Sequence, residues 1–425
     1  MERYNEYKDS SVQWLGEIPS HWGLRRTKYV WKETDSRSEF GSEQLLSVSQ
    51  YDGVREAQSD SRSESLKGYK IVKQDELVIN IMLAWLGGLG VSKHEGIVSP
   101  AYCVYKLQDA QNPRFLHYLY RTPMYLAEFA RHSTGIVPSR WRMYTDDFGE
   151  VLTLLPPIEE QDAMVAYLDT ATAKIDEAIA QQQKMIDLLN ERKQIIINNA
   201  VTKGLNPDAP MKDSGVDWIG KIPEHWEICK LKRVANGFSN GTSATQITFG
   251  TTPYSVTRIE TITTGSINYD KVGYVKKDSS LNRYLLKKND VLISNINSFE
   301  RVGNCAIYDG QHELYHGMNL LRITPLDNIV PEYLLYSLKS ANYMGQMRRA
   351  CKPAINQVSV PSSVVKGIII TFPPLSEQEE IAIYCSRALQ CIEDSVDNCK
   401  KQISLLQERK QIIINDVVTG KVKVS

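Results

Sequence analysis

One sequence pattern occurs twice in this chain, and this repetition restricts the folds that the chain can adopt. Residues 9–30 and 213–234 share 11 of 22 positions at a spacing of 204, including a common Trp, Gly, Ile-Pro and His-Trp. Residues 191–198 and 408–415 both read ERKQIIIN, at a spacing of 217. The same spacing aligns a Pro-Pro pair and a Glu-Gln pair further upstream. Repeats of this kind must be found first, and this one indicates a tandem duplication with two similar halves.

Between these matched ends the two halves diverge. Each half therefore reads as a short opening motif, a variable globular segment and a near-identical C-terminal segment. Weak similarity survives in one strand-like stretch, where Asp75 aligns with Asp290 and Leu77 with Leu292. The predicted division is residues 1–150 for the first opening motif and globular domain, 151–205 for a central helix, 206–370 for a linker, the second opening motif and the second globular domain, and 371–425 for a C-terminal helix.

The C-terminal segment of each half is predicted to be a long helix. Positions from 168 to 200, taken in alternating steps of four and three, are mostly apolar, and so are their copies from 385 to 417. A 3.5-residue period over about five heptads is typical of a coiled-coil seam, and the second copy is the predicted partner. The double prolines should end the preceding strand, Ser376 should cap the second helix, and Gly204 and Gly420 should end the two helices.

The globular segments, about 22–150 and 226–370, mix short β-type runs such as LVINIM and GIIITF with helical stretches such as PRFLHYLYRTPMYLAEFA. This mixture predicts an α/β or α+β fold class. The helical stretch beginning at Phe115-Leu116 matches the one beginning at Tyr333-Leu334.

Composition limits the class of protein. Lys plus Arg and Asp plus Glu are each 50, so the formal net charge is zero. This excludes a uniformly basic nucleic-acid coat but not a local basic face. No run of 18 apolar residues and no secretory signal is visible, so no membrane partner is expected. Seven cysteines without a C-x-x-C pair predict reduced thiols and a cytoplasmic location.

Several catalytic signatures are incomplete. Residues 215–221 fit G-x-x-x-x-G-K, but Ile222 replaces the Ser or Thr that would bind Mg²⁺, and the first copy lacks the pattern. The double prolines lack the polar and aromatic neighbours of an amino-methyltransferase motif, and no nuclease metal constellation follows Pro207-Asp208. His21 and His225 have no second ligand at suitable spacing, so packing beside the adjacent Trp is predicted. No catalytic residue, cofactor site or metal site is expected in this chain.

Taken together, the pattern S-x-V-x-W-[LI]-G-x-I-P-x-H-W, a variable domain, PP-[IL]-x-EQ and a helix ending ERKQIIIN, all repeated, resembles the specificity subunit of type I restriction–modification systems. The resemblance covers the whole chain. It implies a subunit that is not itself an enzyme. Two target-recognition domains would each read half of a split asymmetric DNA sequence, separated by two conserved helices that pair antiparallel.

The resemblance also implies partners. These are double-stranded DNA, two modification (methyltransferase) subunits that bind S-adenosylmethionine, and ATP-dependent restriction subunits that complete the nuclease. Two other interpretations remain open at this point: a fused methyltransferase–endonuclease, and a non-DNA adaptor with two interaction domains on a coiled coil.

Basic and amide residues near the end of each globular domain are the candidate DNA contacts. Arg131-His132 aligns with Arg348-Arg349 at the spacing of 217, and further polar residues follow in both copies. Arginine and lysine neutralise phosphates and pair with guanine, while asparagine and glutamine pair with adenine. The predicted DNA-binding residues are Arg131, Arg140, Arg142, Arg301, Arg348, Arg349, Lys352, Asn356 and Gln357.

Overall fold

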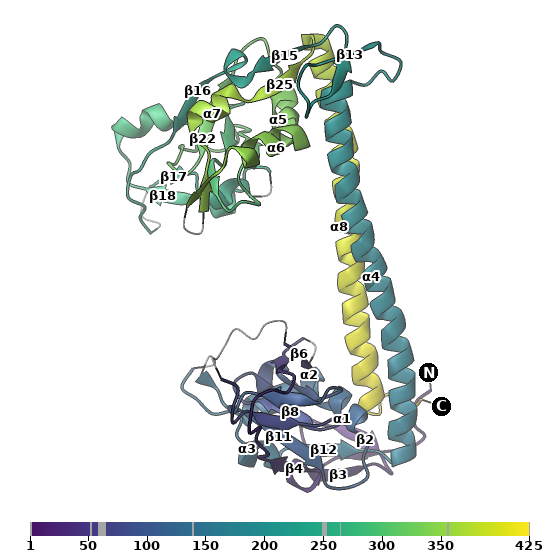
Figure 1. Cartoon of the computed structure of the whole chain (residues 1–425). Helices are drawn as coiled ribbons and strands as arrows, with labels where there is room; N and C mark the ends of the chain where they lie inside the picture. The colour runs from purple at the N-terminus through teal and green to yellow at the C-terminus, as the bar shows by residue number, and fades with distance from the viewer. Residues whose placement is uncertain are drawn as a thin grey trace. The chain divides into compact units, whose positions relative to one another are not determined.

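The computed structural model describes residues 2–51, 53–57, 65–137, 140–248, 253–263, 265–354 and 357–424. The chain forms two compact units: unit 1 contains residues 1–183 and 400–425, and unit 2 contains residues 184–399. Each unit has a globular domain and parts of both long helices, α4 (Ile158–Lys203) and α8 (Leu375–Val418), which lie side by side (Figure 1). No described helix is long and apolar enough to cross a membrane.

Unit 1 is an α+β domain built on an antiparallel four-stranded sheet of order β4-β11-β8-β9. Its helices α1 and α2 follow the sheet in sequence, and α3 precedes the closing strand β12, which pairs with β3. The elements are β1 (Tyr7–Asp9), β2 (Glu17–Pro19), β3 (Gly23–Arg26), β4 (Trp31–Thr34), β5 (Leu46–Ser49), β6 (Gly53–Glu56), β7 (Lys70–Val72), β8 (Leu77–Asn80), β9 (Leu89–Val91), β10 (Gly96–Val98), β11 (Tyr102–Leu107), α1 (Pro113–Tyr120), α2 (Pro123–Arg131), α3 (Thr145–Glu150) and β12 (Leu152–Leu155).

Unit 2 repeats this plan with a sheet of order β16-β22-β19-β21 and a closing pair β15-β25. The elements are β13 (Met211–Asp213), β14 (Lys221–Pro223), β15 (Glu227–Lys230), β16 (Ala235–Asn240), β17 (Tyr254–Val256), β18 (Gly273–Val275), β19 (Val291–Ile293), β20 (Ile296–Asn297), β21 (Cys305–Ile307), β22 (Leu321–Pro325), α5 (Pro331–Lys339), α6 (Ala341–Arg349), β23 (Lys352–Ala354), β24 (Gln357–Ser359), α7 (Ser362–Gly367) and β25 (Ile369–Phe372). The predicted fold class is confirmed, and the duplication extends into segments whose sequences no longer match.

The alignment predicted for the central strands is wrong by one residue. Glu76 and Asp290 are the true counterparts, because each side chain accepts a hydrogen bond of 2.8 Å from the backbone N–H three residues earlier. Leu77 therefore corresponds to Val291, and both belong to the core cluster that includes the long helices. A one-residue slip moves a strand's side chains to the opposite face, so the shared Asp and Leu letters were misleading.

The coiled-coil prediction is confirmed within each unit. Every predicted seam position of α4 and α8 is buried or half-buried, while the positions between them are mostly exposed. In unit 1, Lys410 donates to Asp176 at 2.6 Å, and in unit 2 Lys193 donates to Glu393 at the same distance. These two pairs are counterparts at a spacing of 217. The earlier half of α4 faces the later half of α8 in unit 1, and the later half of α4 faces the earlier half of α8 in unit 2, so the two helices run antiparallel.

The helix ends lie where the sequence predicts them, with one exception. β12 and β25 stop at the double prolines, and α4 and α8 end just before Gly204 and Gly420. Both glycines have positive φ angles of 73° and 75°. A Cβ on Gly204 would lie 3.1 Å from Trp226, and one on Gly420 would lie 2.9 Å from Trp22, so both sites also require a small residue. Ser376 is not the N-cap, because α8 already begins at Leu375.

Candidate nucleic-acid interface

The repeated His-Trp and Glu-Gln motifs meet in each unit and attach the globular domain to the long helix. In unit 1, Glu160 near the start of α4 accepts hydrogen bonds from His21 at 2.6 Å and from the indole of Trp22 at 3.0 Å. The corresponding distances in unit 2, from His225 and Trp226 to Glu377, are 2.6 and 2.9 Å. We call each His–Trp–Glu set a clasp.

The hydrogen bonds to the clasp carboxylate stabilise its ionised form. Burial raises the pKa of Glu160, but hydrogen bonds from His21, Trp22 and Tyr4 outweigh it, so the pKa lies below its ordinary value. The indole rings of Trp22 and Trp226 are buried, which confirms the predicted packing role of this motif. The two histidines, however, are exposed and hydrogen-bond to the clasp carboxylates, so the buried packing predicted for this motif belongs to the Trp and not to the His.

The glutamine of the same motif connects the long helix to the first helix of the globular domain. The Gln161 side-chain oxygen accepts from the backbone N–H of Asn112, directly before α1, at 2.9 Å. The Gln378 oxygen accepts from the N–H of Val330, directly before α5, at 2.8 Å. Each side-chain amide also donates to the carbonyl of the first proline of the double-proline pair at 2.8 Å. In both units the repeated motifs therefore hold the globular domain to the coiled coil.

A hairpin-like segment after α2 and α6 recurs in both globular domains. In unit 1, Thr134 and Arg142 exchange two backbone hydrogen bonds of 2.9 Å. In unit 2, Lys352 pairs with Ser359 in the same way, within a three-stranded sheet of order β20-β24-β23. We call residues 134–142 and 352–359 the recognition hairpins. Each is anchored to the turn after the central strand, through Met143 N–H to Ile81 O at 3.0 Å in unit 1 and Val360 N–H to Asn295 O at 2.8 Å in unit 2.

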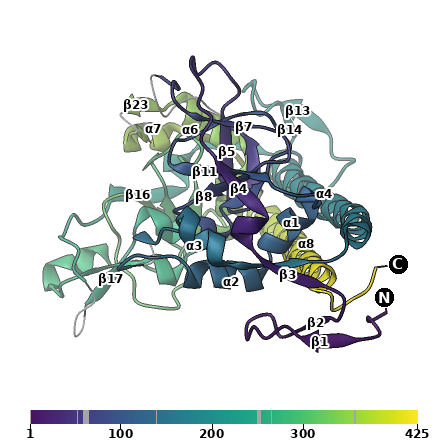
Figure 2. The same cartoon turned by 90° about the horizontal axis from the view of Figure 1, so that it is seen from below.

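Four of the predicted DNA-binding residues of unit 2 gather around its recognition hairpin. Lys352 and Gln357 are exposed on β23 and β24, and Arg301 is exposed in the turn that follows β20. Arg348, at the end of α6, lies 6.0 Å from the ring of Phe299 in that turn. Figure 2 shows β23 and α6 near each other. This small sheet and its adjoining turn therefore present positive charge beside an exposed aromatic ring.

Glu300 lies in the same turn, and its pKa responds to the positive charges around it. Hydrogen bonds from its own backbone N–H and from Ser298 lower the pKa of Glu300, and the charges of Arg348 and Arg301 lower it further. Both arginines therefore act on the same turn. Phe299 is 51% exposed.

In unit 1 the hairpin carries Arg140, which is exposed, and Arg142, which is half-buried and donates to the carbonyl of Trp141 at 2.8 Å. Trp141 packs edge-on against Trp85 of the turn after β8, with ring centroids 5.2 Å apart. The side chain of Ile136 is 95% exposed. The hairpins of the two domains therefore share a backbone arrangement and differ in the side chains they present. Asn356, also predicted to contact DNA, lies outside the described residues.

The predicted pairing of Arg131-His132 with Arg348-Arg349 needs correction. Thr122 caps α2 and Ser340 caps α6, each accepting from the N–H three residues on, so the two helices correspond at a spacing of 218. Arg131 is thus the counterpart of Arg349 alone. Arg131 pairs with the largely buried Glu128, and Arg349 lies 5.1 Å from the ring of Trp218 in the opening motif. Both arginines lie at helix ends and have intramolecular partners.

Sequence reasoning missed the aromatic residues of this surface. Trp85, Trp141 and Phe299 lie in connecting segments without apolar periodicity, and this isolation is the only sequence signal that distinguishes them.

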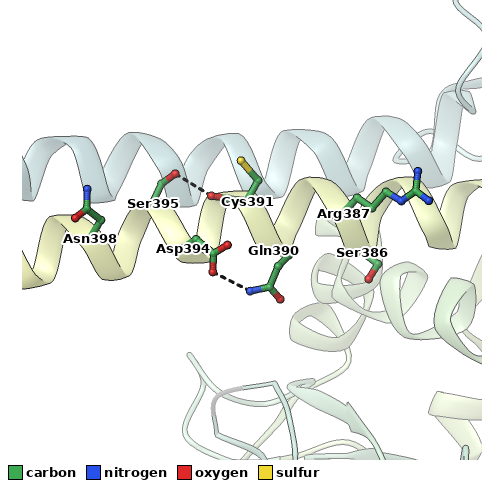
Figure 3. A pocket seen from close by; sticks show the side chains of 7 residues that line it. All are labelled: Ser386, Arg387, Gln390, Cys391, Asp394, Ser395 and Asn398. Carbon is green, nitrogen blue, oxygen red and sulfur yellow. Dashed lines mark hydrogen bonds between the residues drawn. The ribbon is translucent and has the colours of Figure 1, made fainter.

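A shallow hollow lies on the face of α8 (Figure 3). The residues that line it are Ser386, Arg387, Gln390, Cys391, Asp394, Ser395 and Asn398. Within it, Gln390 donates to Asp394 at 2.9 Å and the Ser395 hydroxyl to the carbonyl of Cys391 at 2.8 Å. None of these residues is repeated in α4, so the hollow is not a site common to both units.

Comparison with known proteins finds similarity to one family over part of the chain. Residues 223–403 match the family described as the type I restriction modification DNA specificity domain. The MjaX specificity subunit of a type I restriction enzyme from Methanocaldococcus jannaschii is 38% identical over 205 residues, covering 47% of either chain. The EcoKI specificity subunit of Escherichia coli strain K12 is 25% identical over 256 residues, covering 59% of this chain and 52% of that one. These matches span about half the length of the two relatives.

The fold is shared more widely than the sequence. A solved chain from a study of complex assembly and conformational transition of the type I R-M system superposes with a TM-score of 0.69 at 16% identity, covering 95% of this chain and 99% of that one. At this identity the likeness concerns the fold. The chain is thus similar in fold to that solved chain, and in sequence, over parts of its length, to the type I restriction modification DNA specificity domain and to specificity subunits of type I restriction enzymes.

Proposed function

We propose that this chain is the DNA-recognition subunit of a restriction–modification complex. Each globular domain reads one half of a bipartite, asymmetric double-stranded target. The observation that carries the proposal is the recognition hairpin, which has the same backbone anchoring in both domains and different exposed side chains. A common scaffold with different side chains is the arrangement expected of two readers of two different half-sites.

The chemistry of the hairpins suits DNA. Arginine and lysine neutralise phosphates and can form paired hydrogen bonds with guanine, and glutamine can do so with adenine. Arg301, Arg348, Lys352 and Gln357 supply these groups in unit 2, and Arg140 and Arg142 supply them in unit 1. Because the formal net charge of the chain is zero, attraction to DNA has to come from such local basic surfaces.

The proposal gives this chain no catalytic role. The carboxylates, imidazoles and amides of its repeated motifs are engaged in the clasps and in the contacts to α1 and α5. Methyl transfer is assigned to modification subunits that bind S-adenosylmethionine, and DNA cleavage to restriction subunits. A fused methyltransferase–endonuclease and a non-DNA adaptor are the alternatives that the experiments below would reveal.

Two equivalent modification subunits are supported by the outer faces of the long helices. Leu188, Arg192 and Ile195 are exposed on α4, and their counterparts Leu405, Arg409 and Ile412 are exposed on α8. These identical residues lie off the seam, so pairing between the two helices does not require them. A surface repeated in both units beyond what internal packing needs is expected where the same partner binds twice.

The proposal is tested by measuring DNA binding across a salt series. Each phosphate contact contributes about 0.9 to the slope of log K against log salt concentration. We therefore expect Arg301→Ala and Lys352→Ala each to weaken binding and to reduce the slope by about one. Lys232→Ala is the matched control, because Lys232 is exposed in the same domain but lies outside the hairpin. Parent-like slopes for both variants would remove the hairpin from the interface, and an absence of salt-dependent DNA binding by the parent complex would favour the adaptor.

A further inference from the structure

The clasp of unit 1 has a fourth member that comes from the start of the chain. The hydroxyl of Tyr4 donates to Glu160 at 2.9 Å, to the same carboxylate oxygen that accepts from Trp22. The Tyr4 ring centroid lies 5.6 Å from that of Trp22 and 5.7 Å from that of His21. Tyr4 is 8% exposed. A phenol group thus fills a site whose walls are the three clasp side chains.

Unit 2 has the same clasp without the phenol. The position that corresponds to Tyr4 at the spacing of 204 is Asp208, which is exposed. Among the residues described around this clasp, Oε2 of Glu377 accepts a hydrogen bond from Trp226 alone. A cavity of about 190 Å³ lies here instead, and its lining includes His225, Glu377, Leu205, Ala209, Pro223 and Ile381.

The size and lining of this cavity define the kind of group it can hold. An apolar cavity of about 150 Å³ is large enough to bind benzene, so a six-membered ring fits. The aliphatic side chains can cover the faces of such a ring. The carboxylate only accepts hydrogen bonds when ionised, so the group at the ring's end must be a donor. A neutral phenol satisfies both conditions, and unit 1 holds one in the same surroundings.

The segment that carries Tyr4 also shows how such a phenol can be delivered. It is extended, and the N–H of Lys423, just after α8, donates to the carbonyl of Glu2 at 2.8 Å, so the two ends of the chain lie together (Figure 2). The counterpart of Lys423 after α4 is Asn206, which is exposed. An extended peptide can therefore lie along residues 205–208 with its side chain directed at the clasp of unit 2.

We propose that the cavity beside Glu377 binds a tyrosine side chain on an extended segment of a partner protein, as unit 1 binds Tyr4. The site is separate from the recognition hairpins, and no DNA contact depends on it. Its ligand class is a neutral phenol attached to a peptide, with the ring between Leu205, Pro223 and Ile381 and the hydroxyl on the clasp carboxylate.

The test uses the full chain and the peptide ERYNEY, which repeats residues 2–7. Isothermal titration should give one peptide per parent chain and two per chain of a variant that lacks residues 2–6, because that deletion removes both Tyr4 and the segment that carries it from the site in unit 1. A peptide with phenylalanine in place of both tyrosines should bind about tenfold more weakly, since it loses a hydrogen bond to a charged group. No binding to the parent, an unchanged number of sites in the deletion variant, or equal affinity of the two peptides would overturn the proposal.

A filled cavity is the complementary test. Ala209→Phe should abolish binding to the parent site, whereas Asp217→Phe should keep it, because that change adds the same ring at an exposed position of unit 2 that does not line the cavity. Binding that survives Ala209→Phe would place the peptide elsewhere and contradict the proposal. DNA affinity of both variants should equal that of the parent, so a failure here is distinguishable from a failure of the DNA-recognition proposal.

Discussion

At the scale of single residues, each clasp carboxylate joins several side chains that lie far apart in the sequence. Glu160 accepts hydrogen bonds from three side chains, and Glu377 accepts from two. The Glu-Gln pair was recognisable in the sequence as a repeated motif. Its partner could not be recognised, because His21 and Trp22 lie more than a hundred residues from Glu160 and nothing in local sequence encodes that contact.

Replacing the clasp carboxylate should destabilise unit 1. Glu160→Gln leaves a single acceptor oxygen for three donors, so at least one part-buried donor loses its partner. We expect a loss of about 1–3 kcal/mol in the free energy of unfolding. Denaturant titration measures it, with the exposed neighbour Glu159→Gln as the control. Equal stability of the two variants would show that the clasp is incidental.

The same carboxylate predicts a pH dependence. The pKa of Glu160 is lowered in the folded chain, since His21, Trp22 and Tyr4 hydrogen bonds outweigh the effect of burial. Its contribution to stability is therefore present above the unfolded pKa of about 4.3 and is lost as pH falls through the lower folded value. The stability difference between the parent and Glu160→Gln should be constant at neutral pH and shrink below about pH 4. A difference that grows on acidification would reverse the sign and refute this assignment.

At the scale of elements, the long helices were the most predictable part of the chain. A 3.5-residue period sustained over about five heptads leaves few alternatives, and every seam position proved to be buried or half-buried. The strands were less predictable because most have only three or four residues, too few to fix a register. This is why the sequence alignment of β8 with β19 was wrong by one residue: it followed an identical Asp and Leu and not the turn that precedes both strands.

The identical Ile-Ile-Ile runs allow a matched test of the side of the helix that faces the core of unit 2 against its outer face. Ile197 is fully buried in the core of unit 2, while Ile195 is 50% exposed. Ile197→Ala should cost about 2–5 kcal/mol, and Ile195→Ala should change stability by less than about 0.5 kcal/mol. Native mass spectrometry should nevertheless show that Ile195→Ala combined with Ile412→Ala lowers occupancy by modification subunits, of which the parent binds two. A stable one-to-one complex of the parent at saturation would contradict the repeated docking surface.

At the scale of the whole molecule, the duplication was the decisive sequence signal, and the structure extends it to both sheets, both clasps and both hairpins. The candidate DNA contacts stay predictions. Of the residues that the charge pattern selected, the structure brings Arg301, Lys352 and Gln357 to one hairpin and its turn. It gives Arg131 and Arg349 intramolecular partners, Glu128 and Trp218, which could not be predicted because basic residues at helix ends look alike in sequence whatever they contact.

The central claim is that each globular domain reads its own half of the target. It is tested most directly by replacing residues 227–372, from β15 to the end of β25, with a second copy of residues 23–155, from β3 to the end of β12. The two segments attach to equivalent clasps and begin and end in equivalent strand pairs. Methylated sites would be mapped by long-read sequencing in cells that supply the modification subunit. We expect the parent's two different half-sites to become two copies of one half-site sequence. Persistence of the parent's second half-site in the methylated motif would contradict it.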